Sequence, residues 1–578
     1  MAGPAAPKDP EKARPFFYIL KDKDIFGERQ KDGTGIQFIY ESDGRLINSA
    51  QVTGNVTDKE ELRLLETVEG FGRLVHSIGV SVETDRPEET AEFIFQMYGK
   101  KDLYGGGTNL TTSLKCDGME HRIYLSDYRW TEDDHVPGQI KILFAAPERM
   151  GKVSVRLFLN DGYEASPEEE DLVIDMHSEE YCGMISRSLL QLGNPYRIRK
   201  AIEKSKAGKE VTLAYIGGSI TQGAGAIPIH TECYAYKSFQ LFQNRFSTQN
   251  NVRFIKAGVG GTPSELGMIR FDRDVLREGE RPDIVVIEFA VNDEGDETKG
   301  VCYESLVRKV LKLPWKPAVV LLFSVFANDW NLQERLRPVG NLYDLPMVSI
   351  RDAVTQQFSL KCGEGRILSK NQFFYDIFHP NNTGHTIMAD CLQYLFERCD
   401  AAEPARVGTF VEGMTEEQIL SEKLSGPAVI GADFERIFLL DKKNRYVGAK
   451  IRAGSFTSTD IELQSVEMDG NLTQTPEFPY NWMYDGSRPQ MAGFEMEITC
   501  KSLFLIFKDS GETDVGKANV FVNDVYCMTA DPHKNNWLHC NAVLLFWETE
   551  SRSHKVRIAV TEEDRNKKFT ILGFGYTI

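Results

Sequence analysis

The sequence predicts an α/β domain with a doubly wound parallel sheet and helices on both faces, placed between two β-sandwich domains. Three observations lead to this prediction. The chain has 578 residues, too many for a single hydrophobic core. Short stretches with alternating apolar residues occupy its first and last parts. Between them, apolar runs of strand length alternate with amphipathic stretches of helix length, which is typical of a parallel sheet covered by helices.

Residues 16–185 are expected to form the N-terminal β-sandwich. The run KVSVRLFLND has apolar residues at every second position: Val153, Val155, Leu157 and Leu159. Alternation of period two, interrupted by turn residues, is typical of strands with one buried face. The preceding residues 1–15 are rich in Ala, Pro and Lys and predict a disordered arm or a tag.

Residues 186–400 are expected to form the α/β domain. Four apolar runs predict its strands: VTLAYIG (211–217), VRFIKAG (252–258), DIVVIEFA (283–290) and PAVVLLFSV (317–325). They are apolar on both faces, as strands covered by helices on both sides must be. Helix-length stretches such as PYRIRKAIEKSKAGKE separate them. In a parallel sheet of this kind, ligands bind at the carboxyl ends of the strands.

Residues 401–578 return to period-two alternation and predict the second β-sandwich. Its apolar runs include SLFLIFKD, KANVFVNDVY, KVRIAV and FTILGFGYTI. No repeat of the solenoid type is visible in any of the three parts. The pattern therefore predicts an α/β domain between two β domains.

Composition and charge exclude several classes of function. The net charge of −18 and the pI near 5.2 predict no nucleic-acid partner, because phosphate binding requires clustered Lys and Arg. The sequence has no apolar run long enough to span a membrane, so no membrane association is expected. The ten cysteines include no CxxC pair and predict neither disulfides nor a metal site. No cofactor is expected. Free thiols favour a cytoplasmic location, with an earlier removed signal peptide as the alternative.

Four short blocks contain the residues that carry chemistry. In chain order they are Gly217-Gly218-Ser219-Ile220, Ala257-Gly258-Val259-Gly260-Gly261-Thr262, Phe289-Ala290-Val291-Asn292-Asp293 and Asp376-Ile377-Phe378-His379-Pro380. Three of them follow predicted strands and the last precedes a helix beginning near residue 382, so all four can meet at one edge of the sheet. The first block is neither a GxSxG nucleophile elbow nor a phosphate loop.

In content and order, these blocks resemble those of the SGNH (GDSL-type) hydrolase superfamily, over roughly residues 186–400. The resemblance implies that Ser219 is the nucleophile. The chemistry agrees, because a serine needs a base to take its proton and His379 can supply one near neutral pH. Asp376, three residues earlier, can accept a hydrogen bond from the other ring nitrogen and fix the tautomer.

The same resemblance implies an oxyanion hole made of the backbone N–H groups of Ser219 and Gly261 and the side-chain amide of Asn292. Such donors stabilise the charge that develops on the tetrahedral intermediate. One position departs from the family pattern, because Gly218 stands where the family commonly has aspartate. The departure removes a side chain that could tether the nucleophile loop.

Other polar residues near these blocks have simpler interpretations. We expect His385 to be a helix-surface or core histidine and not a second base. We expect Asp293 to cap or tether a loop. The acidic stretch 293–297 lacks the ligand spacing of a calcium loop and predicts a solvated turn.

Two features favour a carbohydrate ester as the substrate. The segment between Ser324 and Pro346 is polar around Trp330 and offers no apolar lid. The C-terminal loop FPYNWMYDGSRP (478–489) mixes Tyr480, Trp482 and Tyr484 with Asn481, Asp485 and Arg488. Because sugar faces stack on aromatic rings, we expect Trp330, Trp482 and Asn481 to bind substrate. Packing of Trp482 between domains is the alternative.

An SGNH core flanked by jelly-roll-like modules resembles multidomain bacterial carbohydrate acetylesterases of the mannan or xylan type. The resemblance implies a serine esterase that removes O-acetyl groups from plant cell-wall poly- or oligosaccharides through an acyl-enzyme intermediate. Its partner is then an acetylated carbohydrate. One alternative is an esterase for another small acyl ester of peptidoglycan, sialate or lipid. Another is a carbohydrate-binding protein without activity.

Overall fold

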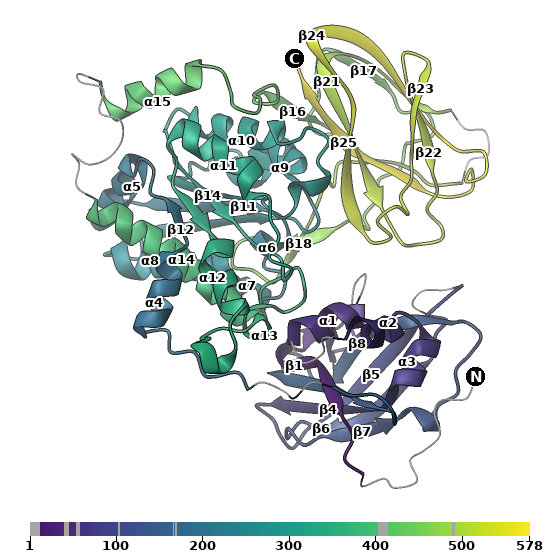
Figure 1. Cartoon of the computed structure of the whole chain (residues 1–578). Helices are drawn as coiled ribbons and strands as arrows, with labels where there is room; N and C mark the ends of the chain where they lie inside the picture. The colour runs from purple at the N-terminus through teal and green to yellow at the C-terminus, as the bar shows by residue number, and fades with distance from the viewer. Residues whose placement is uncertain are drawn as a thin grey trace.

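The computed structural model describes residues 12–39, 45–53, 58–101, 105–165, 167, 170–402, 414–487 and 492–578. Along the chain, a β-rich N-terminal domain is followed by an α/β domain with a mainly parallel sheet and then by a β-rich C-terminal domain (Figure 1). This arrangement confirms the predicted fold class in outline. The doubly wound order and the jelly-roll type of the flanking domains stay predictions, as do the residue boundaries of the domains. Most of the predicted arm, residues 1–11, and Arg488 lie outside the described residues.

The N-terminal domain consists of two antiparallel sheets with one core between them. The first sheet has the order β1 (Phe16–Phe26), β9 (Met150–Leu159), β4 (Val75–Thr84) and β7 (His121–Tyr124). The second has the order β2 (Glu28–Arg29), β3 (Gly35–Ile39), β8 (Asp134–Phe144), β5 (Thr90–Gly99) and β6 (Asn109–Lys115). Its helical turns are α1 (Arg45–Thr53), α2 (Lys59–Arg63), η1 (Leu64–Glu66), α3 (Val68–Leu74) and η2 (Leu125–Asp127). The alternating residues of β9 point into the shared core, as predicted.

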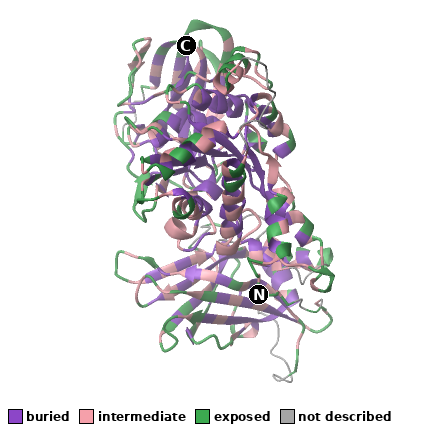
Figure 2. Cartoon of the chain, turned by 90° about the vertical axis from the view of Figure 1, so that its left-hand side faces the viewer, coloured by how far each residue is buried: buried purple, intermediate pink, exposed green. Residues whose placement is uncertain are grey.

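The central sheet has the spatial order β10 (Leu189–Gln191), β15 (Met347–Ser349), β14 (Ala318–Phe323), β13 (Ile284–Glu288), β11 (Val211–Gly217) and β12 (Val252–Gly258). Neighbouring strands pair in parallel, except that the edge strand β10 is antiparallel to β15. Strands β11 to β14 are almost entirely buried, which explains their continuous apolar runs (Figure 2).

Helices cover both faces of this sheet. On one face lie α4 (Glu179–Ser186), α5 (Tyr196–Lys206), α8 (Tyr234–Phe246), α12 (Ile350–Phe358) and α14 (Asn382–Ala401). On the other lie α9 (Ser264–Phe271), α10 (Val301–Leu311) and α11 (Gln333–Tyr343). Short helices occupy the connections: α6 (Ser219–Gln222), α7 (Ile229–Glu232), η3 (Asp272–Leu276), η4 (Asp293–Gly295), η5 (Cys362–Glu364) and α13 (Lys370–Phe373). Tyr181, Met184 and Ile185 of α4, which the sequence assigned to the N-terminal domain, belong to the apolar core of the α/β domain.

The C-terminal domain is built on one large antiparallel sheet in the order β16 (Ile437–Leu440), β25 (Phe569–Thr577), β21 (Phe494–Asp509), β24 (His539–Val560), β22 (Ala518–Val522) and β23 (Val525–Ala530). Strands β17 (Ala449–Arg452) and β20 (Trp482–Tyr484) join it, while β18 (Ser465–Glu467) and β19 (Gln474–Pro476) pair separately. Phe504, Ile506 and Leu572 of the large sheet belong to the same apolar cluster as α9 and α10. The C-terminal and α/β domains therefore share a core.

The N-terminal domain contacts the α/β domain near the last of the four blocks, residues 376–380. Lys23 of β1 is buried and its Nζ donates to the carbonyl oxygen of Asn371, 3.2 Å away, and to that of Phe374. Tyr375 packs against the apolar core of the N-terminal domain. Both flanking domains thus meet the α/β domain close to the edge where the four blocks converge (Figure 1).

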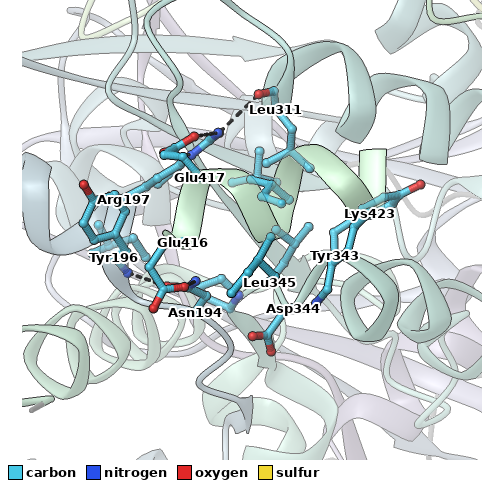
Figure 3. Close-up of a pocket in the computed structure, with 16 residues that line it drawn as sticks. Asn194, Tyr196, Arg197, Leu311, Tyr343, Asp344, Leu345, Glu416, Glu417 and Lys423 are labelled. Atoms are coloured by element: carbon cyan, nitrogen blue, oxygen red, sulfur yellow. Dashed lines mark hydrogen bonds and ion pairs between the residues drawn. The ribbon is translucent and has the colours of Figure 1, made fainter. Parts of the chain in front are cut away.

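A helix between the α/β and C-terminal domains completes the fold. α15 (Glu416–Ser425) lies against α5 and α11, and Glu417 forms an ion pair with Arg197 at 3.0 Å (Figure 3). A cavity of about 40 Å³ beneath it is lined by residues such as Asn194, Tyr343 and Lys423. It contains neither the serine nor the histidine of the four blocks, so it is a packing gap under α15 and not the catalytic centre.

No helix among the described residues combines the length and apolar character that crossing a membrane requires. All ten cysteines fall within the described part of the chain, and each is a free thiol. The described residues also contain no group of three or more His, Cys, Asp or Glu side chains arranged to hold a metal ion.

Candidate active site

The serine of the first block lies directly beyond the end of a central strand. β11 ends at Gly217, Gly218 makes the turn, and Ser219 begins α6. The neighbouring strand β12 ends at Gly258, and its loop brings Gly260 and Gly261 to the same edge. This is the carboxyl edge of the parallel sheet, where the sequence placed the site.

The structure brings Ser219, His379 and Asp376 together in the order that acyl transfer requires. Ser219 Oγ is 2.9 Å from His379 Nε2, and His379 Nδ1 is 2.8 Å from Asp376 Oδ2. The other oxygen of Asp376 accepts from the backbone N–H groups of Phe378 and His379, at 2.7 and 2.8 Å. Asp376 is therefore held on both oxygens, which fixes its orientation toward the imidazole. The arrangement is that of a serine nucleophile, a general base and an orienting carboxylate.

Electrostatics prepare His379 to take up a proton. Burial by itself would lower the pKa of His379, but the charge of Asp376 and its hydrogen bond outweigh burial and raise this pKa above its ordinary value. Burial by itself would raise the pKa of Asp376, but the interactions with His379 and two backbone N–H groups outweigh burial and lower the pKa of this carboxyl. The pair therefore favours an ionised aspartate beside a basic imidazole.

We expect the rate of ester hydrolysis to fall as the pH drops through the pKa of His379, because only the neutral imidazole accepts the proton of Ser219. Since the His379 pKa is raised, the midpoint of kcat/KM should lie above the ordinary histidine value of about 6.5. Asp376→Asn removes the charge that raises it, so the midpoint should move to lower pH. A pH profile with an aryl acetate measures both, and a rate that stays flat down to pH ~4 contradicts a histidine base.

Three hydrogen-bond donors are free to bind an oxyanion beside Ser219. No described residue accepts a hydrogen bond from the backbone N–H of Ser219 or Gly261, or from the side-chain amide of Asn292. Gly261 has a φ of 72°, in the left-handed region that favours glycine. The three groups that the sequence assigned to the oxyanion hole are thus available at the sheet edge.

The structure explains why glycine, and not aspartate, is found at position 218. A Cβ on Gly218 would lie 2.3 Å from Oδ1 and 2.6 Å from Nδ2 of Asn292. The carboxamide therefore occupies the space that an aspartate side chain would need. Gly218 is the residue that lets Asn292 lie directly over the nucleophile turn.

The other polar residues near the blocks differ in how they match the predictions. His385 is fully buried between Tyr234 N and Ala224 O, which confirms a core histidine, and burial lowers its pKa to about 3. Asp293 Oδ1 accepts from Ser264 N at 2.7 Å, which confirms a loop tether. The prediction of a solvated turn at 293–297 is confirmed for Glu294, Gly295 and Glu297, which are exposed, but it is wrong for Asp293 and Asp296, which are buried. Asp296 pairs with Arg335 at 2.9 Å and so helps to tie the turn to α11.

A buried carboxyl beneath the nucleophile turn was not identified from the sequence. Glu288 Oε2 accepts from Thr221 Oγ1 at 3.1 Å, and the same hydroxyl is 2.9 Å from the hydroxyl of Tyr234. Burial raises the pKa of Glu288 to about 7. This chain of hydrogen bonds supports α6 from below. A glutamate in the interior of the apolar run DIVVIEFA was the signal that could have revealed it.

Two of the three predicted substrate-binding residues are corrected by the structure. Trp482 is 6% exposed and packs against Phe494 and Phe574 in the core of the C-terminal domain, so its faces are not available to a sugar. Asn481 is fully buried, and its amide donates to the carbonyl oxygens of Asp460 and Phe478. The prediction for both is wrong because they are structural residues at the start of β20.

A row of aromatic rings links Trp330 to Phe378, the residue next to His379. Its ring stacks on Phe326 at 5.7 Å between centroids, Phe326 packs edge-on against Phe378 at 5.0 Å, and Phe378 is adjacent to His379. This aromatic row forms one wall beside the base. Whether Trp330 binds substrate stays a prediction.

A different tryptophan of the C-terminal domain lies at the catalytic edge. Trp537 is 43% exposed, and a Cβ on Gly261 would lie 2.7 Å from its Cζ2 atom. Its ring also contacts His539, with centroids 4.6 Å apart. Trp537 stands in the polar stretch DPHKNNWLHC, a mixture of aromatic and polar residues like the one that drew attention to Trp482.

Comparison with known proteins places the site in a family context. Residues 215–387 match the model of the GDSL-like Lipase/Acylhydrolase family, which confirms the predicted resemblance for the segment that contains all four blocks. No curated protein matches the chain significantly in sequence.

The fold is similar to solved structures of a two-domain esterase (CEX) active on acetylated mannans. One was co-crystallised with mannopentaose and has a TM-score of 0.54 and 23% identity, covering 68% of this chain and 97% of that chain. A second structure of that esterase has a TM-score of 0.53 and 23% identity, covering 68% and 98%. Axe2, an acetylxylan esterase from Geobacillus stearothermophilus, has a TM-score of 0.26 at 17% identity in a catalytic mutant, covering 33% of this chain and 95% of that chain. At 23% identity, the first two show a likeness in fold over 68% of this chain.

Proposed function

We propose that this chain, whose residues 215–387 match the GDSL-like hydrolases, is a serine esterase that removes O-acetyl groups from mannan- or xylan-type poly- or oligosaccharides. The observation that supports it most directly is the Ser219–His379–Asp376 geometry, with hydrogen bonds of 2.9 and 2.8 Å. Ser219 attacks the ester carbonyl while His379 takes its proton, and the oxyanion is bound by Ser219, Gly261 and Asn292. His379 then donates that proton to the leaving sugar oxygen, which departs as a free hydroxyl. A water molecule deprotonated by His379 hydrolyses the acetyl-enzyme to acetate, and the proton returns to Ser219.

The carbohydrate part of the proposal is supported by the walls of the site. Trp537 of the C-terminal domain stands over the oxyanion loop with much of its surface exposed. Exposed aromatic faces beside polar groups suit the stacking of sugar rings. The fold likeness to an esterase described as active on acetylated mannans points to the same class of substrate. Trp537 thereby takes the role that the sequence assigned to Trp482.

The decisive experiment compares acetate release from acetylated mannan, xylan and pectin oligosaccharides with hydrolysis of an aryl acetate. Mass spectrometry before and after treatment shows which oligosaccharides lose acetyl groups. Loss from mannan or xylan, abolished in the Ser219→Ala variant, supports the proposal. Hydrolysis of the aryl acetate without release from any polysaccharide would leave a serine esterase for another acyl ester, such as one of peptidoglycan, sialate or lipid.

We expect Trp537→Ala to weaken activity on acetylated oligosaccharide by about tenfold or more, since losing a stacked ring costs ~1–3 kcal/mol by analogy with base stacking. Hydrolysis of a small aryl acetate should change little, because that substrate is too short to use the ring. The matched control is Trp547→Ala, another half-exposed tryptophan of the same domain that packs on Phe434. Equal losses on both substrates in Trp537→Ala would mean that Trp537 acts through the loop beneath it and not on the sugar.

A further inference from the structure

The loop that carries the Gly261 N–H is held by side chains of the C-terminal domain. Gln464 Nε2 donates to the carbonyl oxygen of Gly260 at 2.9 Å. His539 Nε2 is 3.1 Å from the carbonyl oxygen of Gly261. Both side chains are buried, and they come from β-domain positions 204 and 278 residues away from the loop.

These contacts fix the direction of the oxyanion donor. The carbonyl of Gly260 and the N–H of Gly261 belong to one planar trans peptide, so they point in opposite directions. A donor anchored on the Gly260 oxygen therefore determines where the Gly261 N–H points. His539 anchors the next peptide, so the peptide planes on both sides of Gly261 are fixed while its φ is 72°.

The two anchoring side chains are themselves held in place. Gln464 Oε1 accepts from the backbone N–H of Cys540 at 2.9 Å, which leaves its amide nitrogen facing Gly260. His539 Nδ1 is 3.1 Å from Asp509 Oδ2, and Asp509 is fully buried as the cross-strand neighbour of His539. Because a carbonyl oxygen only accepts, Nε2 of His539 must donate to Gly261. His539 is therefore an anchor and not a second base, although it is paired with an aspartate as His379 is.

A third link joins the same loop to the C-terminal domain. Gln222 Oε1 accepts from the backbone N–H of Gly260 at 3.0 Å, and Gln222 Nε2 donates to Glu467 Oε2 at 3.0 Å. Gln222 ends α6, the helix that Ser219 begins. The nucleophile turn and the oxyanion loop are thus connected through a residue that the C-terminal domain orients.

We propose that the C-terminal domain completes the oxyanion hole, with Gln464 and His539 as positioning residues that aim the Gly261 N–H at the developing oxyanion. The inference rests on the proposed serine esterase activity but not on its carbohydrate substrate. A donor stabilises the transition state only when it already points at the position the oxyanion will occupy. Because glycines at 258, 260 and 261 give this loop wide conformational freedom, the two anchors restrict the directions in which the Gly261 N–H can point.

The test is Gln464→Met in the full chain, with a small aryl acetate as substrate. We expect kcat to fall about tenfold to a hundredfold, less than the 10²–10³ typical for complete loss of a donor, with KM changed by less than about twofold. Affinity for a boronic acid that forms a tetrahedral adduct with Ser219 should fall by the same factor as kcat. His539→Leu should behave similarly, while His539→Gln, which keeps a donor of similar reach, should recover most of the loss.

The control is Gln356→Met, the same change at an exposed position on α12. Thermal unfolding of each variant gives the folded fraction, and kcat is calculated per folded molecule. If Gln464→Met folds poorly, Gln464→Glu is the second variant, because it removes the donor and keeps the size of the side chain. Two results would overturn the inference. One is wild-type kcat in folded Gln464→Met and Gln464→Glu. The other is a tenfold to hundredfold rise in KM in place of the fall in kcat, with the affinity for the boronic acid unchanged. Failure of the wild type to hydrolyse the aryl acetate would instead overturn the proposed esterase itself.

Discussion

Replacement of Ser219 by alanine should lower kcat for ester hydrolysis by about 10⁴- to 10⁶-fold, the range measured when a triad nucleophile is removed. The reason is that no acyl-enzyme forms without Ser219 Oγ, which lies 2.9 Å from the base. The fold should be unaffected, because the side chain is only partly buried and makes its described hydrogen bond to His379 alone. Thermal unfolding midpoint and the kcat for an aryl acetate measure the two effects separately.

The matched control for this prediction is Ser359→Ala. Ser359 is exposed at the end of α12, and its hydroxyl donates only to the carbonyl oxygen of Gln356. That variant should keep full activity. If Ser219→Ala retained more than a few percent of the wild-type rate, another nucleophile would have to be present and the assignment of Ser219 would fail.

The central sheet could be predicted closely from the sequence. The runs 211–217 and 252–258 coincide with β11 and β12, because strands buried on both faces must be apolar throughout. The residues of the proposed triad could be found in the sequence just as readily, since Asp376 and His379 are three residues apart and Ser219 follows a strand. At these positions the apolar pattern and the spacing of the residues in the sequence match the structure. The predicted roles of the three residues came from the resemblance to a known family.

The walls of the site could not be predicted in the same way. A short stretch with alternating aromatic and polar residues does not reveal which side of the sheet each residue faces. Trp482 pairs with Ile571 across β20 and β25 and points inward, whereas Trp537 lies in the loop before β24 and faces the oxyanion loop. The choice between the two depends on how the C-terminal domain docks, which no local pattern encodes.

The residues that anchor the oxyanion loop, Gln464 and His539, were even harder to predict from the sequence. Gln464 directly precedes β18 and His539 begins β24, and no motif in the sequence around them indicates a contact with Gly260 or Gly261. Their contacts exist because the large C-terminal sheet shares a core with α9 and α10. Docking of the domain through apolar residues therefore determines the polar contacts at the catalytic edge.

Asn292→Ala should lower kcat by about 10²–10³ with little change in KM, as expected for the loss of one oxyanion donor. The carboxamide of Asn292 lies over Gly218, beside the nucleophile, and no described residue uses its N–H group. Since the charge on the ester oxygen develops only in the transition state, the amide should stabilise that state more than the bound substrate. The fall should therefore appear in kcat.

The size of the Asn292→Ala effect distinguishes a donor from a packing residue. Asn471→Ala, the same change at an exposed position of the C-terminal domain, is the control and should keep the wild-type kcat. Asn292→Asp should be at least as damaging as Asn292→Ala, because a carboxylate of similar size fills the space over Gly218 but repels the oxyanion. If Asn292→Asp were instead as active as the wild type, shape alone would matter at this position, and the oxyanion hole would consist only of the N–H groups of Ser219 and Gly261.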